Sequence, residues 1–307
     1  MLREYALDPE VAAASNPSFL TLSNLFGFDR GRVISRFPGN WVKHAINAVN
    51  EAEEIGDLQK HKLVEAIARA KEDKMVRSGR PFNPGLPDWL SSCREEHIKN
   101  PFDAIIVAEN NGGGAEVISA EDATDESHPL VIAKRDAVIE ATGAAIATTL
   151  NFYFRSCREL YFHDKYFQLN NPKYRDTLGA CLAEVPYEKR GEIQCQIHSC
   201  EGRVAPPRQF QKDIVGKLIP DGISIEWFHW KEKEDGKKFH DRYLLTEVGG
   251  VSLGAGFSSE GAHQNVNVQL LGPSVYETAR ESIDKGSHVY ELLEAFRILS
   301  DGTIEEI

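Results

Sequence analysis

The second half of the chain alternates strand-like with helix-like segments, and this alternation restricts the fold more than any other feature. Strand signals at 159–163, 192–198 and 222–230 are separated by helix signals at 172–184 and 207–218. Strands that alternate with helices in this way are typical of a sheet with helices packed on its faces. The sequence therefore predicts an α/β fold for this part of the chain.

Further signals surround this core. A long helix with an apolar middle is expected at 133–157 and a final helix at roughly 273–297. Three more strands are expected at 242–246, 250–254 and 265–271, in the same sheet as the strand at 159–163.

The first hundred residues show helical periodicity instead. Apolar residues share one helix face at 41–53 and again at 57–73, and a segment rich in proline and glycine follows at 78–89. We therefore expect a separate N-terminal helical domain, residues 1–99, that docks a partner protein such as a sensor or an ATPase. The second domain would be residues 100–307, beginning with a hairpin whose glycine-rich tip is Gly112 to Gly114.

Composition limits the functions that are plausible. The 307 residues carry a formal net charge of -12, which repels nucleic acid and anionic membranes, so a phosphorylated ligand would need a local basic pocket. The five cysteines include no Cys-x-x-Cys pair, and we expect reduced thiols and neither a metal nor a cofactor. The longest run of low charge, 141–154, is too short for a membrane span, so we expect a cytoplasmic protein without one.

One motif carries chemistry. His240 precedes Arg242 by two residues and Glu247 by seven, and Gly254 follows seven residues after Glu247. Alternate residues of a strand share a face, so His240 and Arg242 would present an imidazole and a fixed charge together, which suits a phosphate group. The competing interpretation is an ordinary hairpin, whose histidine and arginine bond the backbone or pair with an acid such as Asp164.

This spacing resembles the phospholipase D superfamily motif, His-x-Lys-(x)4-Asp-(x)6-Gly-Ser-x-Asn. The departures are Arg242 for lysine, Glu247 for aspartate, Ala255 for serine and Phe257 for asparagine. The resemblance spans roughly 102–307. It is closest to the degenerate phospholipase D-like domain at the C-terminus of microtubule-interacting-and-trafficking proteins and in bacterial relatives, whose Asp-Pro-Tyr-Phe element resembles the ELYFHDKYF segment here.

The resemblance implies a fold and a set of roles. The fold would be a phospholipase D-like mixed β-sheet flanked by helices, with the helical domain before it. His240 would be the nucleophile, Arg242 would stabilise the phosphate oxygens, and Glu247 would orient an imidazole. We expect further binding residues around them. His163, Asp164 and Lys165 would line the opposite wall, and Ser258 and Ser259 would replace the missing polar groups.

Two functions remain open on this basis. The first is a metal-independent phosphodiesterase, most plausibly a nuclease effector of a bacterial anti-phage system. Because one motif supplies one His240, it would act as a homodimer on nucleic acid or another phosphodiester. The second is a catalytically inactive phosphate- or protein-binding module within a larger complex, which the combined loss of the motif's lysine, serine and asparagine favours.

Overall fold

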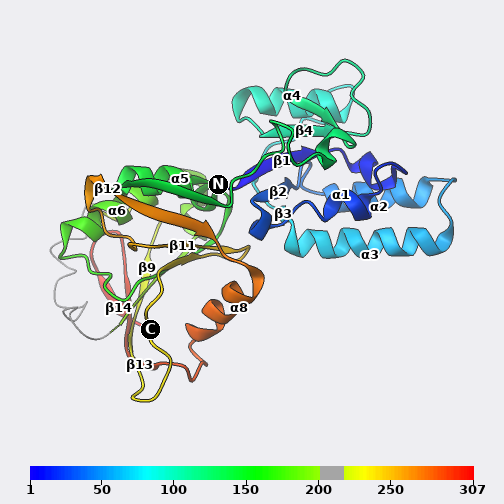
Figure 1. Cartoon of the computed structure of the whole chain (residues 1–307). Coiled ribbons are helices and arrows are strands. Elements are labelled where there is room, and N and C mark those ends of the chain that lie inside the picture. Colours follow the sequence, from blue (N-terminus) through cyan, green and yellow to red (C-terminus); the bar gives the residue numbers. More distant parts are fainter. Residues whose placement is uncertain (201–217) are drawn as a thin grey trace. The chain divides into compact units, whose positions relative to one another are not determined.

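The structure is a computed structural model, and it describes residues 1–200 and 218–307. The helix expected at 207–218 therefore lies, except for its last residue, outside the described residues. The chain divides into two compact units, Met1–Arg135 and Asp136–Ile307, called unit 1 and unit 2 below (Figure 1).

Unit 1 is built on a parallel sheet. The order of its strands is β3-β2-β1-β4-β5, and every neighbouring pair runs parallel. The strands are β1 (Arg3–Leu7), β2 (Arg32–Ser35), β3 (Met75–Val76), β4 (Ala104–Val107) and β5 (Val117–Ser119).

Helices cover both faces of this sheet. On one face, Tyr5, Leu7 and Ile34 pack with residues of α1 (Phe19–Ser23), α2 (Trp41–Glu51) and α3 (Asp57–Asp73). On the other face, Ala6 and Ile105 pack with α4 (Trp89–Lys99). Short 3₁₀ turns complete the unit: η1 (Pro9–Ala13), η2 (Phe28–Arg30) and η3 (Asp122–Thr124).

Unit 1 corrects the expectation of a separate helical domain at 1–99, because it is built on a five-stranded sheet. The two expected helices are confirmed as α2 and α3, but β1, β2 and β3 were missed. These strands are short and covered on both faces, so they lack the alternation that identifies a half-exposed strand. The expected hairpin is also wrong, because β4 and β5 run parallel and belong to this sheet. The unit accordingly ends at Arg135, beyond the expected boundary at residue 99.

Unit 2 is built on a mixed sheet of the order β14-β13-β9-β8-β7-β10-β11-β12-β6. The central strands β7, β8 and β9 are parallel, and all other neighbours are antiparallel. The strands are β6 (Asp136–Ala141), β7 (Glu159–His163), β8 (Gln194–Cys200), β9 (Ile225–Lys231), β10 (Tyr243–Leu245), β11 (Gly250–Leu253), β12 (Gly261–Leu270), β13 (Glu291–Ile298) and β14 (Ile304–Glu306). The expected strands at 159–163 and 242–246 are confirmed in one sheet, as β7 and the shorter β10, and they pair directly.

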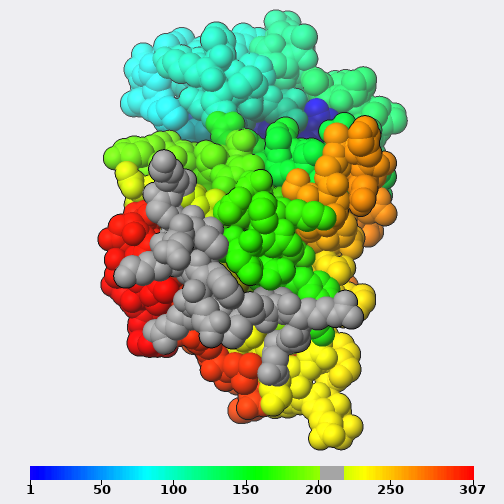
Figure 2. Space-filling model, turned by 90° about the vertical axis from the view of Figure 1, so that its left-hand side faces the viewer, coloured from blue at the N-terminus to red at the C-terminus, as the bar shows by residue number. Residues whose placement is uncertain are grey.

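The helices of unit 2 lie on both sides of its sheet (Figure 1). One side carries α5 (Gly143–Ser156) and α6 (Pro172–Ala183), with the 3₁₀ turn η4 (Tyr187–Glu192) after them, and the other carries α8 (Pro273–Ser282). In Figure 2 the green surface of the first layer lies between the orange surface of β12 and the red surface of the C-terminal strands.

Two expected helices of unit 2 are shorter than predicted. The segment 133–157 begins as β6, and α5 starts only after Thr142, whose side chain caps it by accepting from the N–H of Ala145. The final helix ends at Ser282 instead of near 297, followed by a turn in which Asp284 accepts from the N–H of Gly286 at 2.7 Å, and then β13. In the first segment the cap fixes where the helix begins, and in the second a side-chain bond to the backbone competes with helix continuation.

The central strands of unit 2 have two different faces. Their helical face carries Leu160, Phe162, Ile197 and Trp227, each fully buried, and Phe162 stacks with Phe154 of α5 at 6.3 Å between ring centroids. The opposite face, here called the cavity face, carries Tyr161, His163, Gln194, Gln196, His198, Glu226 and Phe228. The α/β class with a mixed sheet flanked by helices is thus confirmed. No helix within residues 1–200 and 218–307 is long and apolar enough to cross a membrane.

Candidate functional site

The carboxyl end of β7 lies beside the start of β10, and the contacts made there determine which ring nitrogen of His163 carries the proton. His163 is paired with Tyr243 in the strand register, and its ring stacks on Phe239 at 3.9 Å. His163 Nδ1 lies 2.9 Å from the carbonyl oxygen of Asp241, which can only accept, so Nδ1 carries the proton. Burial lowers the pKa of His163 to about 4. At neutral pH its Nε2 is therefore an unprotonated nitrogen, and it makes no hydrogen bond to a described residue.

His240 differs from His163 in almost every respect. It lies in the irregular segment before β10, and 83% of its side chain is exposed. Its Nδ1 is 3.4 Å from the carboxylate of Asp241. His240 is thus an exposed ring beside an acid, whereas His163 is a buried ring placed to accept a proton.

Arg242 is held by the turn that follows β11. Its Nη1 donates to the carbonyl oxygen of Gly254 at 3.1 Å, and its Nε lies 3.9 Å from the buried Asp164. Asp164 also accepts from the N–H groups of Tyr166 and Phe257, and burial raises its pKa. Gly256 passes so close that a Cβ there would lie 2.2 Å from Asp164. The competing interpretation of the sequence was an arginine that bonds the backbone or pairs with an acid such as Asp164. Arg242 makes both contacts.

Two adjoining cavities meet at His240. The first, of about 290 Å³, is lined by His163, Lys237 and Lys238, and the second, of about 480 Å³, by Arg242, Ser252 and Asn267. Both share His240, Asp241, Tyr243 and Val275, and together they are called the histidine groove below.

The charge of the histidine groove is opposite to that of the chain. The side chains that line it include Lys237, Lys238, His240 and Arg242, against a single acid, Asp241. The whole chain has a formal net charge of -12. Clustered cations in a concave site raise the local concentration of anions. The groove therefore has the local basic character that a phosphate ligand requires.

Glu247 does not take the expected role. Its carboxylate accepts from the backbone N–H groups of Arg158 and Glu159, at 2.8 and 3.0 Å, where β7 begins. His163 and His240 lie at the opposite end of this strand pair, and the span from Tyr243 to Glu247 alone is about 13 Å. Glu247 therefore joins two strands and orients no imidazole.

The other expected binding residues are only partly brought together. His163 lines the groove, and Asp164 touches it only through Arg242. Lys165 pairs with Glu232 at 2.6 Å, Ser258 donates to Glu260, and the N–H of Ser259 donates to the carbonyl of Lys173. None of these three is among the groove's lining residues.

Sequence reasoning missed Lys237 and Lys238. The available signal was the KEKEDGKKFH run that ends at His240, where two lysines stand two and three residues before this histidine. No group of three or more His, Cys, Asp or Glu side chains suited to a metal occurs within residues 1–200 and 218–307. All five cysteines are buried, and none of them forms a disulfide.

Comparisons with models of protein families, with curated proteins and with solved structures find no match for this chain.

Proposed function

We propose that unit 2 is a metal-independent phosphodiesterase of the phospholipase D type that binds its substrate in the histidine groove. The observation that carries the proposal is the pairing of His163, neutral with a free Nε2, with three cationic side chains in an acidic chain. Oxygens of a phosphodiester would be bound by Lys237, Lys238 and Arg242.

The two histidines would divide the chemistry between them. Nε2 of His163 attacks phosphorus, and the P–O bond to the leaving group breaks as His240 gives that oxygen its proton. Water then attacks the phosphohistidine, with His240 accepting the water proton, and His163 is released. This arrangement moves the nucleophile from His240, where the motif places it, to His163. It also makes the expected homodimer unnecessary for chemistry, because one chain holds both histidines.

A second candidate function is an inactive phosphate-binding module. The observation that favours it is the engagement of Arg242 with Gly254 and Asp164, which leaves less of its guanidinium for a transition state. Under this alternative the groove holds a phosphate ester without cleaving it.

The biological setting extends the same proposal. A nuclease effector in an anti-phage system would use unit 1 to contact a sensor or an ATPase, and unit 2 to cleave nucleic acid. The acidic chain favours a substrate that enters the groove over a long duplex bound across the surface.

The proposal is tested by incubating the protein with labelled DNA, RNA and a chromogenic phosphodiester in excess chelator. Cleavage should persist in chelator and fall about 100-fold or more in both His163→Gln and His240→Ala. His263→Ala, which removes an exposed histidine of β12 outside the groove, is the matched control and should cleave normally. Phosphate binding without cleavage would support the inactive module instead. Absence of both would overturn the proposal.

A further inference from the structure

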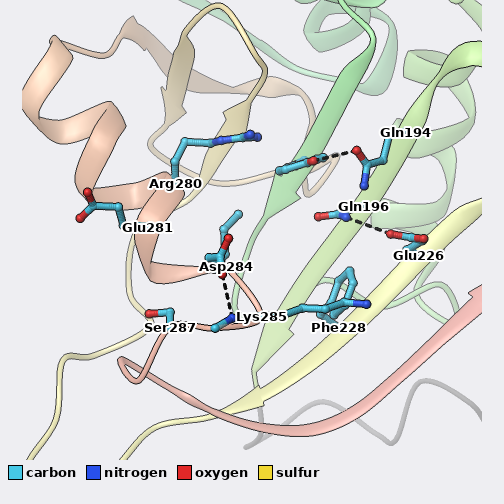
Figure 3. Close-up of a pocket in the computed structure, with 12 residues that line it drawn as sticks. Gln194, Gln196, Glu226, Phe228, Arg280, Glu281, Asp284, Lys285 and Ser287 are labelled. Carbon is cyan, nitrogen blue, oxygen red and sulfur yellow. Dashed lines mark hydrogen bonds between the residues drawn. The ribbon is translucent and has the colours of Figure 1, made fainter. Parts of the chain in front are cut away.

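A third cavity lies on the cavity face, next to the histidine groove. It has a volume of about 850 Å³ and lies between the sheet and the carboxyl end of α8 (Figure 3). Tyr161 lines this cavity and His163 lines the groove, and the two residues are two positions apart on the same face of β7. Their Cα atoms are therefore about 7 Å apart. This space is called the α8 cavity below.

The floor of the α8 cavity is polar where a central sheet usually carries apolar residues. Trp230 can only donate to His198 Nδ1, so His198 Nε2 carries the proton and donates to Gln196 at 3.1 Å. Gln196 donates in turn to Glu226 at 2.9 Å. These bonds all run in one direction, and they orient Gln196 and Glu226, the two members of the chain that line the cavity.

Glu226 ends that chain as a carboxylate. Burial opposes its ionisation, but the bonds from Arg297 and Gln196 outweigh burial and lower the pKa of Glu226 below its ordinary value. Beside it, Gln194 accepts from the hydroxyl of Tyr161 at 3.0 Å (Figure 3). Acceptors and donors thus alternate across the floor.

The roof of the cavity contains a donor without an acceptor. Nη2 of Arg280 donates to Glu159 at 2.6 Å, but its Nη1 is buried and has no hydrogen-bond partner among the described residues. Nη1 is shielded from the cavity as well, so a ligand oxygen would satisfy this donor only after the guanidinium turns toward the cavity. Asp284, Lys285 and Ser287 complete the roof (Figure 3).

The two aromatic residues of the floor are already covered. The guanidinium of Arg280 lies 4.4 Å from the centre of the Tyr161 ring, and Nζ of Lys285 lies 5.0 Å from that of Phe228. A flat base would therefore find no free ring on which to stack. A ligand that bonds through several groups that both donate and accept fits this lining better, and hydroxyl groups have that property.

We propose that the α8 cavity binds a polyhydroxyl ring, a sugar or a cyclitol, and that this ring is attached to the phosphate held in the histidine groove. The second half of this statement rests on the proposed function. It narrows the substrate to phosphate esters of such rings, with the ring hydroxyls against Gln194, Arg280 and Asp284. The short separation along β7 lets one ligand occupy both sites.

Calorimetry and ligand-observed NMR would test this with glucose, myo-inositol, adenosine, inorganic phosphate and glucose 1-phosphate. Glucose 1-phosphate should bind at least about tenfold more tightly than inorganic phosphate, because the two halves are linked. Gln194→Leu, at an exposed position, should remove that advantage and leave phosphate binding unchanged. Gln264→Leu, at an exposed position of β12 outside both sites, is the matched control and should change neither.

The outcomes separate the two proposals. In one outcome glucose or myo-inositol binds, Gln194→Leu weakens that binding, and phosphate does not bind. This result would support the ring site and reject the proposed function. Equal affinity for glucose 1-phosphate and inorganic phosphate would overturn the ring site and leave the groove intact. Adenosine binding that exceeds glucose binding and depends on Gln194 would also overturn it, in favour of a base.

Discussion

The two faces of the unit 2 sheet are made by alternate residues of the same three strands, yet they differ in chemistry. Phe162, Ile197 and Trp227 on the helical face are fully buried apolar side chains. His163 and Gln196, their neighbours in sequence, lie on the cavity face and bond in fixed directions. The helical face therefore holds the sheet together, while the cavity face is free to carry polar groups around ligand-sized spaces.

The largest effect should come from the helical face. Phe162→Ala removes a ring that packs on Phe154, Phe167 and Phe257, and it should lower the free energy of unfolding by about 3–5 kcal/mol. Gln194→Leu on the cavity face should change it by less than about 0.5 kcal/mol. Urea denaturation of unit 2 measures both. Similar losses in the two variants would show that the faces do not differ as described.

Acid should act on the cavity face through His163. Its pKa in the folded chain is about 4, below the ordinary value of 6.5. The unfolded chain therefore binds the proton first, and stability present above pH 6.5 is lost as the pH falls toward 4. The loss from His163 alone is about 3 kcal/mol. Urea midpoints measured between pH 7.5 and pH 4 would follow it.

His163→Phe supplies the matched control for this pH dependence. The ring can still stack on Phe239, but it has no proton to bind. Between pH 6.5 and pH 4 the variant should lose about 3 kcal/mol less stability than the wild type does. Because burial also lowers the pKa of His198, part of the wild-type dependence should remain. An unchanged slope in His163→Phe would contradict the neutral, buried state of His163.

The turn after β11 should tolerate no side chain at Gly256. Its φ of +75° and the close approach of Asp164 and Arg242 both oppose a Cβ. Gly256→Ala should therefore cost roughly 2 kcal/mol more than Gly261→Ala, whose φ is +100° but which has open space around it. Thermal unfolding of the two variants gives the difference. Equal costs would mean that only the backbone angle matters there.

The smallest effect concerns Glu247. Glu247→Ala removes the acceptor of two backbone N–H groups and should cost about 1 kcal/mol of stability, as loss of a helix cap does. Phosphodiester cleavage per folded molecule should stay unchanged, because Glu247 lies far from the groove. Glu277→Ala, at an exposed acid of α8, is the control. A large drop in activity alone would restore the role that the motif implies.

The sequence predicted what local periodicity and spacing can specify. The alternation after residue 159 predicted β7, α6 and β8 closely, and the motif drew attention to the end of β7 and the start of β10. It could not predict which histidine is buried, because Phe239 and the Asp241 carbonyl reach His163 from a distant segment. Nor could it place Glu247, whose partners lie about 90 residues earlier. Unit 1 was misread because buried parallel strands have no polar alternation.

The proposed attack by His163 depends on where its imidazole carries the proton. Nitrogen-detected NMR of the imidazoles at pH 7, during titration with inorganic phosphate, would report the tautomer and its response. The account predicts a neutral ring protonated at Nδ1, with an Nε2 signal that shifts as phosphate binds beside it. A ring that is charged at pH 7, or an Nε2 signal that ignores saturating phosphate while His240 also stays unchanged, would contradict it.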